Sequence, residues 1–257
     1  MDLHQRLRIE REHHDKVYER RPPKETFIAD RFYMTRPYGM KQLLDKVGPV
    51  AGLTVLDVGC GLGLFSLYFA SRDANVYAID ISSVALHSFD PPMNVVRLLA
   101  PGEFLPLQDN SVDVVWGAAI LHHLDLSLAV PEFHRVLKPG GRCFFYEPLG
   151  HNPVYNLWRR MTPHLRTPTE RPLLLSDLKP LLEVFGRTVE VHFYHLIASL
   201  PQAFAKGLAL LRLPGKPVYR RIQQLEPILA RGDNILFRVW TVLQRYSQAS
   251  GIICTKL

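Results

Sequence analysis

Short apolar runs and amphipathic segments alternate along the middle of the chain. The apolar runs have the length of buried strands, and the segments between them have the length and spacing of short helices. Continuous apolar strands that alternate with helices indicate an α/β fold, in which a parallel sheet is covered on both faces. Strands are predicted at 53–58, 75–80, 94–100, 112–118 and 142–147, and helices at 64–72, 83–89 and 127–137. Pro131 is placed in the first turn of the last helix, where its missing N–H costs least.

The pattern changes on both sides of this region. Residues 5–21 and 34–47 are predicted to be helical, whereas residues 148–175 contain five prolines and several arginines and are predicted to form an irregular lid segment. A further helix is expected to begin at Ser176 as its N-cap and to end at Gly186. The remaining predictions are strands at 188–195 and 250–257, with helical segments at 199–213 and 218–246.

The long excursion between the last two predicted strands is consistent with an antiparallel edge hairpin. The domain organisation expected from these patterns has a helical cap at 1–48 and a core at 49–147. Residues 148–257 are then the lid, a helical insertion and the final strands of the same domain.

The length of the chain allows one full α/β core with additions, because 257 residues can bury a core of that size. No apolar run reaches the ~18–20 residues that span a bilayer, and the charged first residues do not resemble a signal peptide. The three cysteines, Cys60, Cys143 and Cys254, are few and widely spaced, which argues against a disulfide framework and favours a reducing compartment. A cytoplasmic protein is the expectation.

Charge is distributed unevenly along the chain. Residues 148–257 carry 15 Lys and Arg against 6 Asp and Glu, a net charge of +9, while residues 1–147 carry 16 against 18. A basic half suggests an acidic partner, which could be a phosphate, a carboxylate, an anionic lipid or a nucleic acid. The alternative is a solvated basic surface with no partner.

A glycine-rich motif, VLDVGCGLG (55–63), lies where the first core strand meets the first helix. Its glycines allow a tight turn and a close approach to a ligand, and Asp80 at the end of the next strand can accept both hydroxyls of a ribose. The spacing is G-x-G-x-G, whereas a dinucleotide site has G-x-G-x-x-G. Asp57 would also repel a pyrophosphate but can orient a loop around a cationic amino-acid ligand. The motif therefore favours S-adenosylmethionine over NAD.

Five ordered blocks carry a resemblance that covers about residues 50–147: VLDVGCGLG, AID, LPLQDNSVDVVW, ILHHL and FHRVLKPGG. Together they resemble the class I S-adenosylmethionine-dependent methyltransferases, in particular the enzymes of ubiquinone and menaquinone biosynthesis. The resemblance implies a Rossmann-like, mostly parallel seven-stranded sheet of order 3-2-1-4-5-7-6, with S-adenosylmethionine bound at the carboxyl ends of its strands. It implies cofactor contacts by Asp57, Gly59, Cys60, Gly61 and Gly63 around the methionine, Asp80 at the ribose, Ile81 against the adenine and Ala118 near the sulfonium.

One position departs from the family. The family places an acid shortly before the Leu-Pro pair to receive the adenine amino group, whereas this chain has Pro101 and Gly102 there. Three alternatives follow: the acidic contact is lost, a backbone carbonyl replaces it, or Glu103 supplies it.

Candidate catalytic residues follow two core strands. Methyl transfer is an in-line displacement in which alignment supplies much of the rate, and a hydroxyl acceptor must also lose a proton. His122, His123 and Glu147 are the candidates for the base, with loop packing or support of a neighbouring residue as the alternative roles. No metal is expected, because no further residue with ligand spacing joins His122, His123 and Asp125.

The acceptor side is expected at residues 147–173. Asn152, Tyr155, Arg159 and Arg166 are the candidate acceptor contacts, since arginine suits phosphate or carboxylate, and the alternative is a solvated surface loop. Tyr33 and Tyr38 are expected to close the site from the N-terminal side, unless they only pack the first helices.

The function that these observations favour is methylation of a small-molecule or lipid-like acceptor, at oxygen rather than at nitrogen or carbon. The acceptor is expected to be acidic or amphiphilic, and arginines among apolar helical residues are compatible with peripheral membrane contact. The alternatives are an RNA methyltransferase, disfavoured because no RNA-binding module is recognisable, and a non-catalytic cofactor-binding protein that docks to a membrane or partner. The sequence does not identify the acceptor or the oligomeric state.

Overall fold

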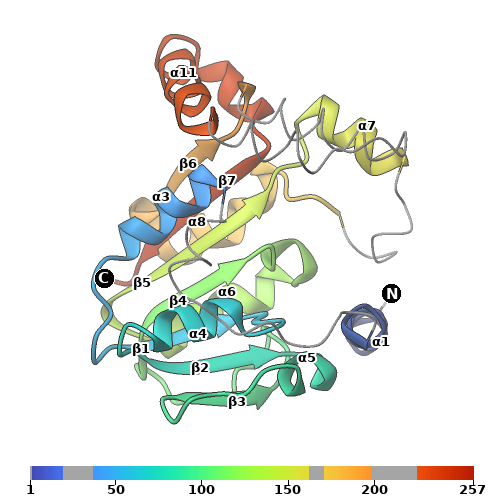
Figure 1. Cartoon of the computed structure of the whole chain (residues 1–257), viewed down its shortest axis with the longest axis vertical. Coiled ribbons are helices and arrows are strands. Elements are labelled where there is room, and N and C mark those ends of the chain that lie inside the picture. The colour runs from blue at the N-terminus through green and yellow to red at the C-terminus, as the bar shows by residue number, and fades with distance from the viewer. Residues whose placement is uncertain (1, 20–36, 162–170, 198–224) are drawn as a thin grey trace.

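The computed structural model describes residues 2–19, 37–161, 171–197 and 225–257, and seven of its strands form one mixed sheet (Figure 1). The sheet has the order β3-β2-β1-β4-β5-β7-β6, as expected. Strands β1 to β5 are parallel, and β7 runs antiparallel between β5 and β6. The strands are β1 (Thr54–Val58), β2 (Asn75–Asp80), β3 (Val95–Leu99), β4 (Val112–Ala118), β5 (Leu137–Pro148), β6 (Glu190–Tyr194) and β7 (Ala249–Thr255).

Helices cover both faces of this sheet. The helices that precede the parallel strands or connect them are α1 (Leu3–Glu19), α3 (Tyr38–Val47), α4 (Leu64–Ala70), α5 (Ser83–His87), the 3₁₀ turn η1 (Leu121–His123) and α6 (Leu126–Val136). Those that follow are α7 (Pro153–Met161), η3 (Leu175–Leu178), α8 (Lys179–Phe185), η4 (Gly186–Thr188), α11 (Glu226–Val239) and η6 (Thr241–Tyr246). None of the described helices is long and apolar enough to cross a membrane.

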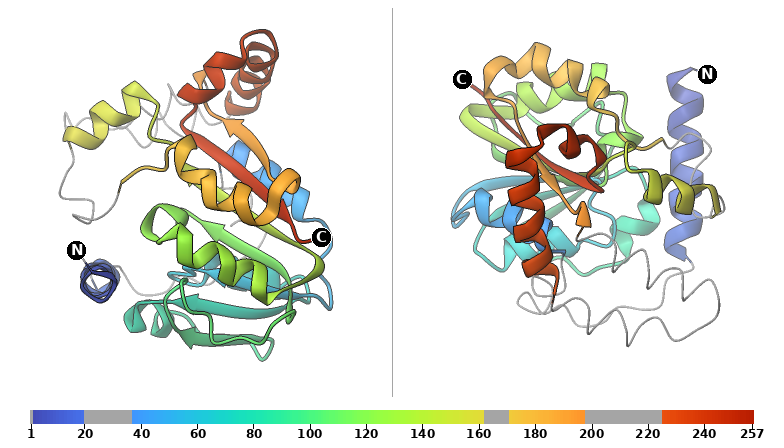
Figure 2. Two further views of the ribbon diagram at one scale, coloured as in Figure 1. Left: turned by 180° about the vertical axis from the view of Figure 1, so that it is seen from behind. Right: turned by 90° about the horizontal axis from the view of Figure 1, so that it is seen from above.

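The hydrophobic core has two parts, one on each face of the sheet, because successive strand side chains point to opposite faces. On one face α6 and α8 pack against the strands, with Phe133 of α6 against Phe145 of β5 (Figure 2, left). On the other face α3 and α4 provide the cover, and Phe69 of α4 packs against Trp116 of β4. In β1 the alternation sends Val55 to the second face and Leu56 to the first.

The starts of two helices were predicted wrongly, as was the irregular segment that follows β5. Helix α6 begins at Leu126 after the N-cap Asp125, so Pro131 lies in the second turn, and the helix tolerates it because its apolar face is buried. Ser176 is not an N-cap: a 3₁₀ turn precedes α8, which starts at Lys179 because Pro180 lacks the N–H that an earlier start would use.

The segment predicted to be irregular contains α7. Asn152 accepts a hydrogen bond from the N–H of Tyr155 at 2.9 Å, as an N-cap does, and Pro153 occupies the first helical position. The predicted helix at 199–213 and the first part of the one at 218–246 lie outside the described residues, while α11 and η6 occupy the rest.

The parallel strands all end at one edge of the sheet, and this edge positions the site. The chain turns one way from β1 to β2 and β3, and the other way through β4 and β5, so a crevice opens between β1 and β4. Helix α1 stands apart from the two helical layers, next to α5, at this edge (Figures 1 and 2).

Candidate active site

A cavity of about 240 Å³ lies at the carboxyl ends of the parallel strands. Its walls come from the ends of β1, β2, β3 and β4 and from α1, which covers one side. The strand-end residues are at 58–59, 79–81, 100–103 and 118–120. This is the crevice where ligands bind in open α/β sheets, because the loops diverge there and leave backbone groups exposed.

The turn after β1 needs glycine at its first position. Gly59 has φ of +67°, and a Cβ there would lie 2.5 Å from the side chain of Ile120. Gly61 donates its N–H to Oδ2 of Asp80 at 2.8 Å, which ties the turn to the end of β2. The Cys60 thiol points into the core, and burial raises its pKa well above the ordinary value, so this side chain stays neutral. The Cys60 N–H donates to the carbonyl of Ile79 and its carbonyl accepts from the N–H of Gly63, both at 2.9 Å, and Cys60 does not line the cavity, so its cofactor contact stays a prediction.

Asp57 is buried beneath the glycine turn. Its carboxylate accepts a hydrogen bond from the Ser66 hydroxyl at 2.6 Å, which links β1 to α4. Burial raises the pKa of Asp57 to about 7; the Ser66 hydrogen bond opposes this shift, and the negative charge of Asp80 adds to it. Asp57 does not line the cavity, so it would act on a cationic ligand through its charge from beneath the turn, and the charge of that ligand would favour the ionised form.

Asp80 lines the cavity at the end of β2. Its two oxygens accept hydrogen bonds at 2.8 Å from the N–H groups of Gly61 and Ser82, so the carboxylate is fixed in orientation. Burial raises its pKa, with those two backbone donors opposing the shift. Ile81 follows it in the same wall, and Ala118 lies opposite, at the end of β4.

Glu103 lies in the cavity wall and is buried. Its Oε1 accepts hydrogen bonds from Arg6 of α1 and from the N–H of Asp125, the latter at 2.9 Å. Among the residues that the structure describes, none gives Oε2 a hydrogen-bond partner, although this atom is also buried. A buried acceptor without a partner is costly, so its position on a cavity wall suits a ligand that donates a hydrogen bond.

His122 and Glu147 form a buried pair next to the cavity. The Nδ1 atom of His122 lies 2.7 Å from Oε2 of Glu147, and their side chains are 4% and 0% exposed. The other oxygen, Oε1, accepts hydrogen bonds at 2.8 Å from the N–H groups of Ile120 and Leu121. Glu147 therefore orients both the loop after β4 and the imidazole. With Nδ1 held this way, Nε2 is the atom that would take a proton.

A second cavity adjoins the first. His122 lines this second cavity, while His123 and Arg6 line both, so the two cavities share a wall.

Ala119, between β4 and η1, has φ of +58° although it is not glycine. A strained backbone of this kind persists where the surroundings over-determine it, which is common beside functional sites.

The other candidate residues lie in different places. Asn152 caps α7 and also donates to the carbonyl of Tyr246 at 2.8 Å, and Arg159 lies over the ring of Tyr155 at 5.2 Å. Tyr38 lines a small separate cavity between α3 and β6. None of these lines either cavity described above, so their acceptor contacts stay predictions. Tyr33 and Arg166 lie outside the described residues.

Sequence reasoning missed the part of the site that α1 supplies. Five of its residues line the first cavity: Arg6, Leu7, Glu10, His14 and Tyr18. Their i, i+3 and i+4 spacing places them on one helical face, which is the only signal in the sequence. Because most of these side chains are charged or polar, the pattern is typical of a solvated helix, and the cavity face is not distinguishable without the fold.

Comparisons with known proteins agree with this geometry. A sequence model described as a methyltransferase domain matches residues 56–145. A malonyl-[acyl-carrier protein] O-methyltransferase of Erwinia billingiae is 32% identical over 187 residues, which are 68% of this chain and 74% of the relative. The chain belongs to the class I S-adenosylmethionine-dependent methyltransferases.

Two further methyltransferases resemble the chain, one in sequence over part of its length and one in fold. An uncharacterized methyltransferase of Mycobacterium tuberculosis is 38% identical over 108 residues, and this match spans 42% of the chain and 44% of the relative, less than half of either. Geranyl diphosphate C-methyltransferase of Streptomyces coelicolor, solved with Mg²⁺, geranyl diphosphate and S-adenosylhomocysteine, has a TM-score of 0.58 at 14% identity and covers 98% of both chains. That structural likeness shows the methyltransferase fold alone.

Proposed function

We propose that the chain transfers a methyl group from S-adenosylmethionine to a small acidic acceptor, at oxygen. The observation that carries the cofactor part is the pair of buried carboxyl groups in the wall of the first cavity, Asp80 and Glu103, with Asp57 buried beneath the glycine turn behind them. Asp80 would hold the ribose hydroxyls and Glu103 the adenine amino group, while the charge of Asp57 would act on the cationic amino-acid end of the cofactor from beneath the turn. Ile81 would pack against the adenine ring, and Gly59 at the start of the glycine turn would lie against the methionine.

The unpartnered oxygen of Glu103 is the feature that supports the adenine contact. An exocyclic amino group has hydrogens to donate, so it would satisfy an acceptor that the described protein leaves without one. Of the three alternatives raised by Pro101 and Gly102, the proposal adopts the one in which Glu103 takes the role of the missing acid.

The second cavity is the proposed acceptor site. Arg6, Arg171, His122 and His123 lie in its wall and could donate hydrogen bonds to an acidic group. Glu10, Asp125 and Asp177 line it too, and Arg171 is paired with Asp177, so these donors and not a net positive charge support an acidic acceptor. Because it adjoins the first cavity, an acceptor oxygen there could be aligned with the methyl group, and alignment supplies much of the rate of an in-line displacement. A relative named as an O-methyltransferase of malonyl-[acyl-carrier protein] adds support for an oxygen acceptor.

His122 is the proposed base where the acceptor is a hydroxyl. Glu147 fixes its Nδ1 and would stabilise the imidazolium that forms when Nε2 takes the proton. A carboxylate acceptor carries no proton to lose, and for such an acceptor the pair would only position the oxygen.

A lipid-like acceptor or an anionic membrane surface is the finer form of this proposal. Large apolar side chains on α11 and η6 are more than half exposed, and exposed arginines stand among them; these residues are Ile228, Ile235, Val239, Trp240, Val242, Arg231, Arg238 and Arg245. Such a mixture suits the interface of an anionic bilayer. Co-sedimentation with anionic vesicles at low salt should fall when the salt concentration is raised, and it should also fall in Ile235→Ser. Leu182→Ser is the control and should leave it unchanged, since Leu182 on α8 is also more than half exposed.

The deciding experiment is transfer of a labelled methyl group from S-adenosylmethionine to candidate acceptors, including malonyl thioesters and hydroxylated aromatic acids. Methyl esters release labelled methanol in mild base and methyl ethers do not, so the product identifies the accepting group. Calorimetry with S-adenosylhomocysteine should show binding that Asp80→Ala weakens by about 1.5–3 kcal/mol. Binding without transfer to any acceptor would favour a non-catalytic cofactor-binding protein, and absence of binding would overturn the proposal.

A further inference from the structure

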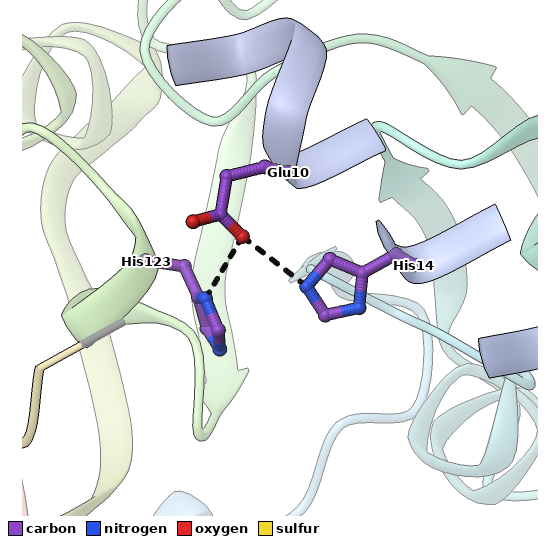
Figure 3. A group of neighbouring side chains, drawn as sticks. All are labelled: Glu10, His14 and His123. Carbon is purple, nitrogen blue, oxygen red and sulfur yellow. Dashed lines mark hydrogen bonds and ion pairs between the residues drawn. The ribbon is translucent and has the colours of Figure 1, made fainter. Parts of the chain in front are cut away.

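Two side chains of α1 meet a histidine of η1 at the edge of the first cavity (Figure 3). Glu10 and His14 are one helical turn apart, so both project from the same face of α1. His123 reaches them from the 3₁₀ turn after β4, more than one hundred residues away in sequence. The convergence is therefore a product of the fold and not of local sequence.

The three donor atoms have the separations of ligands around one small ion. Oε2 of Glu10 lies 3.1 Å from Nδ1 of His123 and 3.5 Å from Nε2 of His14, and the three ligand atoms all lie within 4.8 Å of one another. A tetrahedral zinc ion with bonds of about 2.0–2.1 Å places its ligand atoms about 3.3–3.4 Å apart. The two separations from Oε2 of Glu10 are close to that value before any ion is added, and the separation between the two histidine nitrogens lies within 4.8 Å.

The contacts around the triangle hold it in shape. Arg6 of α1 donates to the backbone carbonyl of His123, and the ring of His122, itself fixed by Glu147, lies 4.2 Å from the ring of His123. Residues that contact the ligands without binding the ion are typical of metal sites, and they contribute to the affinity for the metal. The Glu10 carboxylate is only 5% exposed, so little solvent reaches the group that lies between the two histidines.

We propose that Glu10, His14 and His123 bind one divalent transition-metal ion, with zinc as the prototype, and that this ion fastens α1 across the cofactor cavity. Two imidazoles and one carboxylate suit zinc and its first-row neighbours better than magnesium or calcium, which prefer all-oxygen sites. Three protein ligands leave a fourth position open, and it faces the cavity because all three residues line it. No metal was expected from the sequence because the two ligands on α1 could not be placed there.

The test uses the full chain without an affinity tag, stripped of metal by a chelator. Cobalt(II) is the probe, since a tetrahedral site gives it an intense visible absorption band, and zinc should displace it with a stoichiometry of one ion per chain. Glu10→Gln and His14→Gln should each weaken zinc binding by more than about 10-fold, because even groups behind the ligands contribute 10- to 100-fold. His4→Gln is the matched control, since His4 is exposed on the same helix.

Equal zinc affinity in the wild type, Glu10→Gln and His14→Gln would overturn the proposal, as would a cobalt spectrum of the hydrated ion at saturation. His123→Gln provides a third, independent variant if a change on α1 prevents folding, which circular dichroism would reveal. Calorimetry with S-adenosylhomocysteine on the same samples keeps this test separate from the proposed function, because cofactor binding can persist when the metal site is absent.

Discussion

Glu147 on β5 holds Nδ1 of His122 at 2.7 Å, and neither side chain is more than 4% exposed. The pair joins the loop after β4 to the neighbouring strand, because the same carboxylate also accepts two backbone N–H groups of that loop. The orientation of the imidazole is thus coupled to the shape of the wall between the two cavities.

Glu147→Gln should lower kcat while the acceptor KM and the affinity for S-adenosylhomocysteine stay near wild type. Glutamine can still accept the two backbone hydrogen bonds through Oε1 but cannot stabilise an imidazolium. If His122 is the base, His122→Ala should lose about 10²- to 10⁴-fold in kcat, and the double variant should be no slower than His122→Ala, since the two side chains act as one unit. Additive losses would contradict the coupling, and three mild effects would mean that alignment alone drives the transfer.

Asp57→Asn should change how stability depends on pH. Burial raises the pKa of Asp57 to about 7, so the folded protein holds this proton more tightly than the unfolded chain does. The free energy of unfolding that this group contributes therefore falls as pH rises from about 4 through about 7, by on the order of 3 kcal/mol between pH 5 and pH 8. Urea unfolding at several pH values should show that decline in the wild type and a weaker one in Asp57→Asn. Parallel curves would show that Asp57 has an ordinary pKa.

Gly59→Ala should destabilise the chain and weaken cofactor binding. Its φ of +67° is costly for alanine, and the added Cβ would meet Ile120 at 2.5 Å. Together these predict a loss of about 2–4 kcal/mol in the free energy of unfolding. Gly232→Ala is the matched control: Gly232 lies within α11 with nothing near its Cβ position, so alanine there should stabilise the chain by about 0.5–1 kcal/mol. Thermal unfolding of the two variants should move in opposite directions.

Glu103→Gln should weaken S-adenosylhomocysteine binding by roughly 10-fold, with a loss of about 1–2 kcal/mol, because a neutral amide is a poorer acceptor for the adenine amino group. An analogue with a carbonyl in place of that amino group should bind the wild type weakly, and its affinities for the wild type and for Glu103→Gln should be similar. Glu183→Gln, on the exposed side of α8, is the control. Equal affinities of wild type and Glu103→Gln for S-adenosylhomocysteine would show that adenine is read elsewhere.

The parallel core was predictable because its strands are largely apolar runs that alternate with helices, although the edge strand β3 contains Arg97 and is partly exposed. The helix boundaries were less predictable. Pro131 and Ser176 were misplaced because tertiary burial and a neighbouring proline, rather than local preference, fix where α6 and α8 begin.

The candidate site also has a part that the sequence predicts and a part that it does not. Asp57, the glycine turn and Asp80 belong to one local unit of strand, turn, helix and strand, so their proximity follows from sequence order. The contribution of α1 does not, since Glu10 and His123 are brought together only by long-range packing. The left-handed backbone of Ala119 also leaves no trace in the residue type, because alanine has no preference for that conformation.

The position of β7 has a consequence for biosynthesis. This strand is made after β6, yet it separates β6 from β5, and β6 pairs with no other strand among the described residues. Until residues 249–255 have left the ribosome, β6 has no hydrogen-bonded neighbour among the described strands, and the edge of β5 leaves its backbone N–H and C=O groups unpaired. Pairings between segments so far apart in sequence form slowly. We therefore expect the nascent chain to assemble β1 to β5 first and to depend on chaperones until β7 inserts.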